Sequence, residues 1–561
     1  MPDPRRSFFA RAMGDVSELV QTGWRGFKSQ GLDHFNLWVI ALLIGIGAGT
    51  AALFFRKGIE SLQAWLYGTD NVNMLHSFAE TLPWYWIVLI PMVGGLLVGL
   101  ILHFFTEGGR TDGVAEVIEG AALSDGRVEL KGGLASATAA FITLSSGGST
   151  GREGPVVHIA GLISTWFSNL IKADGITGRD LLGCAVAAAV SASFNAPIAG
   201  AIFAMEVILR HFAVHAFAPI VIASVAGTII NRLEFGGVTE FVLPDENTLE
   251  FYVELPAFLM LGLLCGLVAV ILMRAIFWTD EIATEVQNRT RLPRYFRPAV
   301  AGLCLGLLAI MFPHIIGVGY ETTSLALTGQ LLLWQAVVYS ILKVVAVAIT
   351  VGGRMGGGLF SPSLMLGALI GLAFGIVATS VFPNVSGSET LYALAGMGAL
   401  AAAVLGAPIS TTLIVFELTG DWQTGLAVMM AVSMSSAVAS RLVDRSFFLT
   451  QLERRNVHLA AGPQAYLLAK VRVAMLLKDP GETGVASEEA CWELIEQGAY
   501  LDGAATLEAA MPVFDQGGVT FMPVVTLFED RPPELLGVLH QVDALKAYNY
   551  ELAQTAAEEH S

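Results

Sequence analysis

The chain has 561 residues, of which 54% are hydrophobic and only 14% are charged. A soluble protein of this size carries about a quarter charged residues, so the composition excludes an ordinary soluble enzyme or binding protein. The formal net charge of −17 argues against a nucleic acid as a partner, because proteins that bind nucleic acids present a basic surface. The four cysteines form no CxxC pair, which gives no sign of a disulfide framework or a zinc site, and no motif predicts a cofactor.

The first 34 residues carry five Lys or Arg residues and lack the apolar core and cleavage site of a signal peptide. We expect them to form a cytoplasmic segment ahead of a membrane domain over residues 35–450. A bilayer is crossed by about 20 apolar residues in a helix. The clearest stretches of this kind are 35–55, 84–105, 255–278, 332–351 and 424–440. The sequence therefore predicts an all-α polytopic membrane protein surrounded by lipid.

The charges on the two sides of the apolar stretch 255–278 predict its orientation. The loop 233–254 contains six acidic residues and no Lys or Arg, whereas the segment 279–297 contains four arginines. Positively charged loops stay in the cytoplasm. We therefore expect the acidic loop outside and both termini inside. The membrane we expect is the inner membrane of a bacterium.

The membrane domain contains an internal repeat. Residues 195–206 read NAPIAGAIFAME and residues 406–417 read GAPISTTLIVFE, so each copy has a glutamate nine positions after its proline. A glycine-rich turn that ends in proline precedes each copy: GREGP at 151–155 and GLFSP at 358–362. Repeats with segments interrupted by Gly and Pro are typical of transporters, in which broken helices of inverted repeats meet near the bilayer midplane.

The two glycine-rich turns suit an anion. A turn that opens a helix presents backbone N–H groups without a partner, and the helix dipole adds partial positive charge at the same end. Two such turns could hold an unhydrated anion without a buried lysine. Glu153 would lie at a helix N-terminus, where its carboxylate can occupy the anion site and, once protonated, swing away. The competing interpretation is a salt bridge to a distant arginine, or a loop end in water.

These residues resemble the motifs of the CLC family of chloride channels and chloride/proton antiporters. Residues 151–155 match its GREGP signature and residues 358–362 match its GxFxP motif. The segments 195–207 and 396–419 also resemble CLC segments in the same order, so that the resemblance covers roughly residues 35–455. It implies a CLC-like fold of inverted-repeat broken helices and a homodimer with a separate anion pathway in each subunit.

The resemblance also implies roles for individual residues. Glu153 would be the external gating glutamate. The residues near chloride or a similar small anion would be Asp112, Gly113, Arg152, Gly154, Leu359, Phe360 and Phe448.

Two departures from the family pattern concern protons. The internal proton glutamate of the antiporters aligns with Val207, and CLC channels also tend to have valine there. The usual Ser-Ile-Tyr is replaced by Ser-Phe-Phe at 446–448, so Phe448 offers no hydroxyl. The resemblance therefore implies anion transport with weak or absent proton coupling. A proton-coupled exchanger with a non-standard proton route is the alternative.

A third departure concerns Asp112. The family's GSGIPE motif corresponds to TDGVAE at 111–116, so Asp112 stands where a serine offers its hydroxyl to the anion. An ionised carboxylate at that place would repel the anion. Either the anion lies elsewhere, or Asp112 titrates, or Thr111 replaces the serine. The alternative without a function is that Asp112 caps a helix.

Other polar residues near the motifs have weaker interpretations. His158, His211 and His215 could relay protons, since histidine titrates near neutrality, although a packed or interfacial role is more common. Lys343 and Arg274 lie inside apolar stretches, where we expect them to snorkel or to line the aqueous pathway. An intramembrane enzyme is the alternative from a different class. The sequence shows no arrangement of nucleophile, base and orienting group, so we expect no enzyme.

Residues 465–550 have an ordinary soluble composition and predict a small α/β cytoplasmic domain. The stretch 506–549 reads helix, strand, strand, helix and resembles one CBS module. Its sequence GVLHQVD at 537–543 matches the module's Gly-x-x-Thr/Ser-x-x-Asp signature, with Asp543 as the aspartate and His540 in place of the hydroxyl residue. CBS modules normally pair, and only one convincing copy is present. The resemblance therefore implies a structural or dimer-bracing role rather than nucleotide binding.

Overall fold

The computed structural model describes residues 4–559 apart from short stretches, namely 70, 72–73, 174, 213, 237–240, 242–253, 384, 456, 458–466, 469–470, 482–484, 504, 508–509, 512, 515–518 and 527–532. Most of the acidic loop predicted at 233–254 lies outside the described residues, as do the side chains of residues 1–35.

The membrane domain is helical throughout. Its elements are α1 (Pro4–Tyr67), α2 (Leu75–Ala79), α3 (Trp84–Phe105), η2 (Glu107–Gly109), α4 (Val114–Leu123), α5 (Leu130–Ser145), α6 (Glu153–Ile171), α7 (Gly175–Phe194), α8 (Pro197–Phe203), the π-helix η3 (Ala204–Leu209), α9 (Val214–Phe235), α10 (Leu255–Thr290), η5 (Arg294–Phe296), α11 (Arg297–Met311), η6 (Pro313–Ile315), α12 (Tyr320–Leu327), α13 (Leu333–Gly352), α14 (Phe360–Val381), α15 (Glu389–Leu405), α16 (Pro408–Thr419), α17 (Trp422–Leu442) and α18 (Phe447–Glu453).

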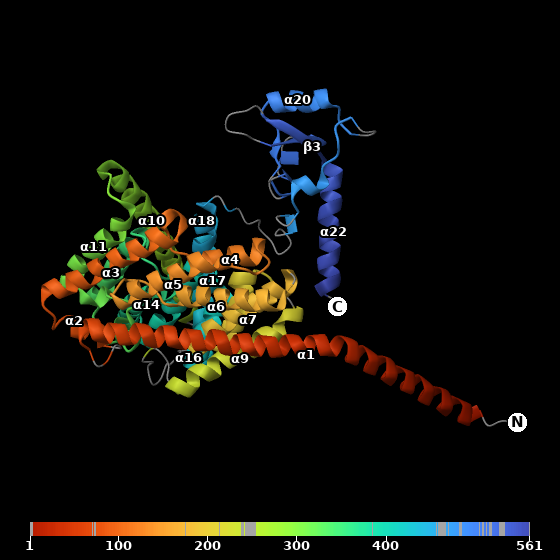
Figure 1. Cartoon of the computed structure of the whole chain (residues 1–561). Helices are drawn as coiled ribbons and strands as arrows, with labels where there is room; N and C mark the ends of the chain where they lie inside the picture. Colours follow the sequence, from red (N-terminus) through yellow and green to blue (C-terminus); the bar gives the residue numbers. More distant parts are fainter. Residues whose placement is uncertain are drawn as a thin grey trace.

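Nine helical segments among the described residues are long and apolar enough to cross a membrane. Each of the five apolar stretches picked out above falls within one of them to within one residue. The all-α polytopic fold class is therefore confirmed. The N-terminal segment is no separate unit of secondary structure, because α1 continues through it and extends beyond the helical bundle (Figure 1).

The centre of the bundle consists of short, small-residue helices. Every residue of α15 from Leu391 to Leu405 is buried. Its neighbour α14 approaches it so closely that a Cβ atom on Gly367 would lie 2.3 Å from the carbonyl oxygen of Gly396. Helices without large side chains at their contact pack backbone to backbone, as is common inside membranes.

The two repeat copies are joined by their glutamates. Glu206, in η3, accepts hydrogen bonds from the first backbone N–H groups of α16 at 2.8 and 2.9 Å. Glu417, in α16, accepts hydrogen bonds from the first N–H groups of α8 at 2.7 and 3.0 Å. Each repeat thus caps the broken helix of the other. The glutamates accept hydrogen bonds from N–H groups for which lipid offers no acceptor.

The C-terminal residues form a small α/β domain, drawn in blue at a distance from the bundle in Figure 1. Its sheet has the order β1-β2-β3, with β1 parallel and β3 antiparallel to β2. Its elements are η7 (Val473–Leu476), α20 (Glu488–Glu496), β1 (Leu501–Asp502), β2 (Phe521–Thr526), β3 (Glu534–His540) and α22 (Gln541–Glu559). The predicted order of strand, strand and helix agrees with β2, β3 and α22, whereas β1 and α20 were not predicted. The predicted first helix lies partly outside the described residues.

Candidate anion pathway

The two glycine-rich turns of the sequence touch each other at the centre of the bundle. Gly151 and Gly358 form an isolated antiparallel bridge, in which the N–H group of each donates to the carbonyl oxygen of the other at 2.7 Å. The side-chain hydroxyl of Thr150 also donates to the Gly358 carbonyl at 2.8 Å. The first turn leads into α6 at Glu153 and the second into α14 at Phe360. The N-termini of two helices from different halves are therefore brought together.

This contact requires glycine on both sides. A Cβ atom on Gly358 would lie 2.7 Å from the backbone nitrogen of Gly154, and a Cβ atom on Gly154 would lie 2.9 Å from the Cα atom of Gly358. Both distances are shorter than real Cβ contacts allow. Any larger residue at either position would separate the two helix N-termini.

The Glu153 side chain reaches across this junction. It is only 3% exposed, and its Oε1 atom accepts a hydrogen bond from the hydroxyl of Ser361, in the first turn of α14. The Nε atom of Arg152 lies 4.0 Å from the same oxygen. The Oε2 atom is buried without a hydrogen-bond partner among the described residues. The carboxylate therefore lies neither in water nor against a distant arginine, which were the two competing interpretations.

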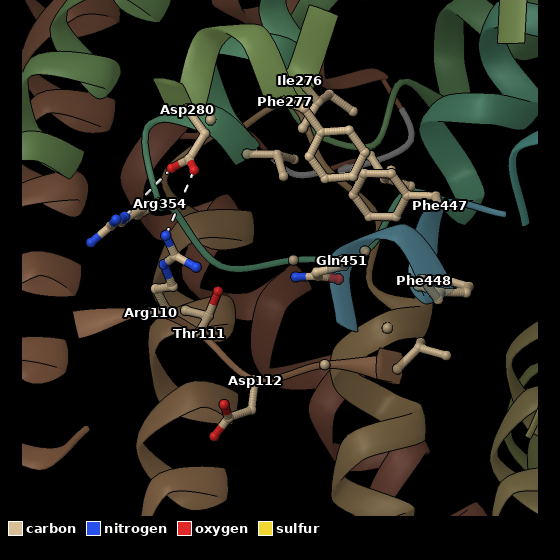
Figure 2. A pocket seen from close by; sticks show the side chains of 18 of the residues that line it. Arg110, Thr111, Asp112, Ile276, Phe277, Asp280, Arg354, Phe447, Phe448 and Gln451 are labelled. Atoms are coloured by element: carbon tan, nitrogen blue, oxygen red, sulfur yellow. Dashed lines mark ion pairs between the residues drawn. The ribbon is translucent and has the colours of Figure 1, made fainter. Parts of the chain in front are cut away.

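The chain neighbours of this glutamate line two different cavities. The first, of about 40 Å³, is lined by Arg152 and by residues of α1, α2, η6 and α12; we call it the narrow cavity. The second, of about 240 Å³, is lined by Gly154 and by the loops before α4 and α14; we call it the wide cavity (Figure 2). Arg152 and Gly154, the residues before and after Glu153, thus line different cavities.

The structure brings most of the predicted anion-lining residues together. The wide cavity is lined by Asp112, Gly113, Gly154, Leu359 and Phe448. The other two expected residues lie elsewhere. The Arg152 guanidinium lines the narrow cavity, 5.1 Å from the ring centre of Tyr320.

Phe360 lines neither of these two cavities with its side chain. Its ring packs against Phe194, with 4.7 Å between ring centres, and against Phe203 at 6.0 Å. Only its backbone, at the first position of α14, belongs to the junction of the two turns. The expectation that its backbone amide faces an anion stays a prediction.

Asp112 lines the wide cavity with its carboxyl group turned toward α5. Its Oδ2 atom accepts a hydrogen bond from Ser136 at 3.2 Å, and Figure 2 shows the carboxyl group pointing away from Phe448. The N-cap of α4 is Gly113, whose N–H group donates to Glu116, so the helix-cap interpretation of Asp112 is wrong. Burial, and then the charge of Glu116, raise the pKa of Asp112 above its ordinary value.

The two positions tied to proton transfer are apolar and buried. Val207 lies in the π-helix η3, directly after the capping residue Glu206. Phe448 lies in the first turn of α18 on the wall of the wide cavity. Its neighbour Phe447 stacks on Phe277, with 5.2 Å between ring centres.

The structure contradicts the expectation for Lys343, whereas the expectations for Arg274 and for the histidines stay predictions. Lys343 does not snorkel: it is fully buried, and its Nζ atom donates to the carbonyl oxygens of Gly317 at 3.0 Å and Ile315 at 3.4 Å. Arg274 is exposed and donates to the Leu442 carbonyl at 3.1 Å. The three histidines named above line neither the wide nor the narrow cavity.

Five charged residues of the wide cavity were missed from the sequence: Arg110, Asp280, Arg354, Arg454 and Arg455. Asp280 lies in the basic segment 279–297, which was used only to predict orientation. Arg110 lies directly before the motif at 111–116 and Arg354 lies four residues before the motif at 358–362, at positions to which no motif draws attention.

The fold and the paired turns define a multi-pass membrane protein of the anion-transport class. Residues 94–440 match the family model described as voltage gated chloride channel. The chain is 33% identical over 422 residues to a putative chloride channel protein ClcB-like from Ralstonia nicotianae, an alignment that covers 74% of this chain and 96% of that one. It therefore belongs to the voltage-gated chloride channel family, the CLC family.

Solved structures share the fold. A slow cyanobacterial Cl⁻/H⁺ antiporter superposes with a TM-score of 0.65 at 23% identity, over 75% of this chain and 97% of the other. A eukaryotic CLC transporter superposes with a TM-score of 0.65 at 18% identity, over 91% of this chain and 98% of the other. At these identities the likeness concerns the fold alone.

Proposed function

We propose that this protein transports chloride or a similar small anion across the membrane along a pathway that passes between the two glycine-rich turns. We propose that Glu153 is the gate of this pathway. The observation that carries the proposal is the position of the Glu153 carboxylate. It is buried at the N-terminus of α14 and bonded to Ser361, and the neighbouring residues Arg152 and Gly154 line two different cavities. An anion would find the same partial positive charge there, so the carboxylate and the anion compete for one place.

We propose further that proton coupling is weak or absent. Val207 cannot carry a proton, and Phe448 has no hydroxyl to pass one along. The alternative is a proton-coupled exchanger with a different proton route. Its support is Asp112, a carboxyl group of raised pKa on the wall of the wide cavity. The antiporters among the structurally similar proteins do not decide between the two, because their identity to this chain is low.

The proposed setting is the inner membrane of a bacterium, with the wide cavity facing the cytoplasm. Asp280, on its wall, belongs to the basic segment 279–297, and basic segments stay inside. We expect a homodimer without enzymatic activity, braced by the CBS-like tail. Asp543, the signature aspartate, is bonded to Lys478 at 2.6 Å, which supports a structural rather than a nucleotide-binding role.

The test is anion flux from liposomes that contain the purified full-length protein, with chloride and pH recorded together. Glu153→Ala and Glu153→Gln remove the titratable group, so chloride flux should lose its pH dependence. The matched control is Glu285→Gln, an exposed glutamate on α10 paired with Arg289. An unchanged rate and an unchanged pH profile in Glu153→Ala would contradict the gating role.

The same recordings test the coupling. A chloride gradient should drive little proton movement in the wild-type protein, because an acid at 207 and a hydroxyl at 448 are both missing. A fixed integral ratio of chloride to protons would instead establish the exchanger, and Asp112→Asn would then show whether Asp112 carries the proton.

A further inference from the structure

A third cavity lies at one end of the membrane domain. It has a volume of about 240 Å³ and is formed by the end of α3 with η2, by η5 with the first residues of α11, and by the loop before α14. We call it the side cavity. Its polar side chains belong to His103, Thr106, Arg294, Tyr295 and Arg354. Arg354 is the one described residue that it shares with the wide cavity, and it shares none with the narrow cavity, so we treat it as separate from the proposed anion pathway.

The side cavity is lined by positive charge. Its described lining residues include two arginines and one histidine, and no acidic side chain. Arg294 is exposed and forms no ion pair among the described residues. Its charge is therefore available to a ligand in the cavity.

Arg354 reaches the side cavity from the loop before α14. Its Nη1 atom donates to the carbonyl oxygen of Gly108, a lining residue, at 3.5 Å. Its Nε atom lies 3.6 Å from Asp280 (Figure 2), whose carboxylate is already bonded to Arg297 at 2.6 Å. Burial, and then the like charges of Arg297 and Arg110, lower the pKa of Arg354 to about 10. The guanidinium stays protonated at neutral pH, and an anion in the side cavity would relieve the repulsion between it and its neighbours.

The side cavity lies at the level where a bilayer meets water. The helix α3, which is long and apolar enough to span a membrane, ends at Phe105, and Phe104 and Phe105 are 72% and 67% exposed. Aromatic residues gather at the interfaces between membrane and water. His103 joins these rings to the cavity, because its ring centre lies 5.2 Å from that of Phe104 and 5.6 Å from that of Tyr295. A ligand of the cavity would therefore have charged groups on one side and exposed apolar rings on the other.

We propose that the side cavity binds the phosphate group of an anionic phospholipid, with Arg294 and Arg354 on the phosphate and the acyl chains beside Phe104 and Phe105. The lipid belongs to the cytoplasmic leaflet, and this detail rests on the orientation given under the proposed function. Guanidinium groups suit phosphate because their N–H donors form a planar fork. Basic pockets between membrane helices on the cytoplasmic side bind the headgroups of anionic lipids. A free phosphate ion has the same chemistry but no apolar part for the exposed rings, so we assign the cavity to a lipid.

The alternative is a water-filled crevice in a basic surface that attracts every anionic lipid by its charge alone. Arg291 offers the matched control, because it is exposed, lies three positions before Arg294 in the same basic segment, and does not line the side cavity. Surface charge predicts equal effects of the two arginines on lipid binding. A built site predicts an effect of Arg294 alone.

The test measures lipid binding to the full-length protein in detergent by native mass spectrometry. The titrant is dioleoylphosphatidylglycerol, and the quantity compared is the affinity for the first lipid bound per subunit. Arg294→Gln should weaken this step about fivefold, which is the contribution of one basic side chain beside an anionic headgroup. Arg294→Glu, which reverses the charge, should weaken it more. Arg291→Gln should leave the affinity within about twofold of wild type, as expected for an exposed charge without a fixed partner.

Two further titrants identify the source of the phosphate group. Dioleoylphosphatidylcholine should bind more weakly than dioleoylphosphatidylglycerol, because its choline group brings a positive charge toward the arginines. Inorganic phosphate should raise the melting temperature of the wild-type protein less than dioleoylphosphatidylglycerol does, because it has no acyl chains. Equal or stronger stabilisation by inorganic phosphate would assign the cavity to a free anion and refute the lipid.

Equal losses of affinity in Arg294→Gln and Arg291→Gln would reduce the effect to surface charge and overturn the proposal. Unchanged affinity in both Arg294 variants would overturn it as well. Because Arg294 is exposed and has no ion pair among the described residues, its variants should melt like the wild type in the absence of lipid. No part of this test depends on chloride flux, so the site stands or falls independently of the proposed transport function.

Discussion

Removing one repeat glutamate tests how the two halves of the membrane domain are held together. Glu417→Ala deletes the acceptor of two N–H groups at the start of α8, which lie 2.7 and 3.0 Å from its carboxylate oxygens. A donor left without its partner costs about 1–3 kcal/mol, so two of them cost about 2–6 kcal/mol. Pro197 precedes them and has no N–H group of its own, so the loss is confined to these two.

The measurement is thermal unfolding of the full-length protein in detergent, followed by tryptophan fluorescence. Glu417→Ala should lower the melting temperature clearly, and Glu417→Gln should lower it less, because the amide oxygen remains an acceptor. Glu206→Ala should cost about as much, since Glu206 accepts the same pair of bonds from α16. Because the two carboxylates use different N–H groups, the double variant should show additive losses.

The control for this series is Glu285→Ala, at an exposed glutamate of α10. If Glu417→Ala melts at the same temperature as this control, the reciprocal caps contribute nothing to stability. A loss in Glu417→Ala with none in Glu206→Ala would show that the two caps are not equivalent, and the energetic argument from symmetry would be refuted.

Two further predictions concern pH. Burial, and then Glu116, raise the pKa of Asp112, which disfavours its ionised form in the folded protein. Asp112→Asn should raise the melting temperature at pH 7. The gain should vanish at a pH well below about 4, because the native carboxyl group is then neutral in the folded and in the unfolded protein. Equal gains at both pH values would contradict this prediction. Burial, and then His76, lower the pKa of His314 to about 4. The unfolded chain therefore binds more protons than the folded protein between about pH 6.5 and 4. As the pH is lowered through that range, the melting temperature should fall, and it should fall less steeply in His314→Gln. Equal slopes in the two proteins would refute the assignment.

The paired turns were predictable because their signal is local. Glycines and a proline within five residues indicate a turn that opens a helix, whatever the rest of the chain does. The hydrogen bond between Glu153 and Ser361 was not predictable from such signals, because it joins residues 208 positions apart. That Arg152 and Gly154 line different cavities was missed for a related reason. Successive residues at the start of a helix face different directions, so neighbours in the sequence need not share a surface.

Lys343 shows a different limit. A lysine inside an apolar stretch predicts snorkelling only if its helix faces lipid at that position. In α13 the polar residues Ser340, Lys343 and Thr350 share the buried face, and the expectation of snorkelling overlooked this spacing. The structure packs Lys343 against the loop 315–319, whose carbonyl oxygens accept its hydrogen bonds. The partners of this charge are backbone atoms, which leave no trace in the residue types of that loop.

The distribution of charge differs between two parts of the proposed pathway, the junction of the two turns and the wide cavity. Between the turns the Glu153 carboxylate is 3% exposed, and the Nε atom of Arg152, which lines the narrow cavity, lies 4.0 Å from it. Backbone amides at the two helix N-termini attract an anion with partial charges, which hold it less tightly than a buried guanidinium in direct contact would. The Glu153 carboxylate can take the anion's place. In the wide cavity, Arg110 and Arg354 are partly exposed, so solvent and salt screen their charge. The ion pairs of both arginines with Asp280 reduce their net charge further.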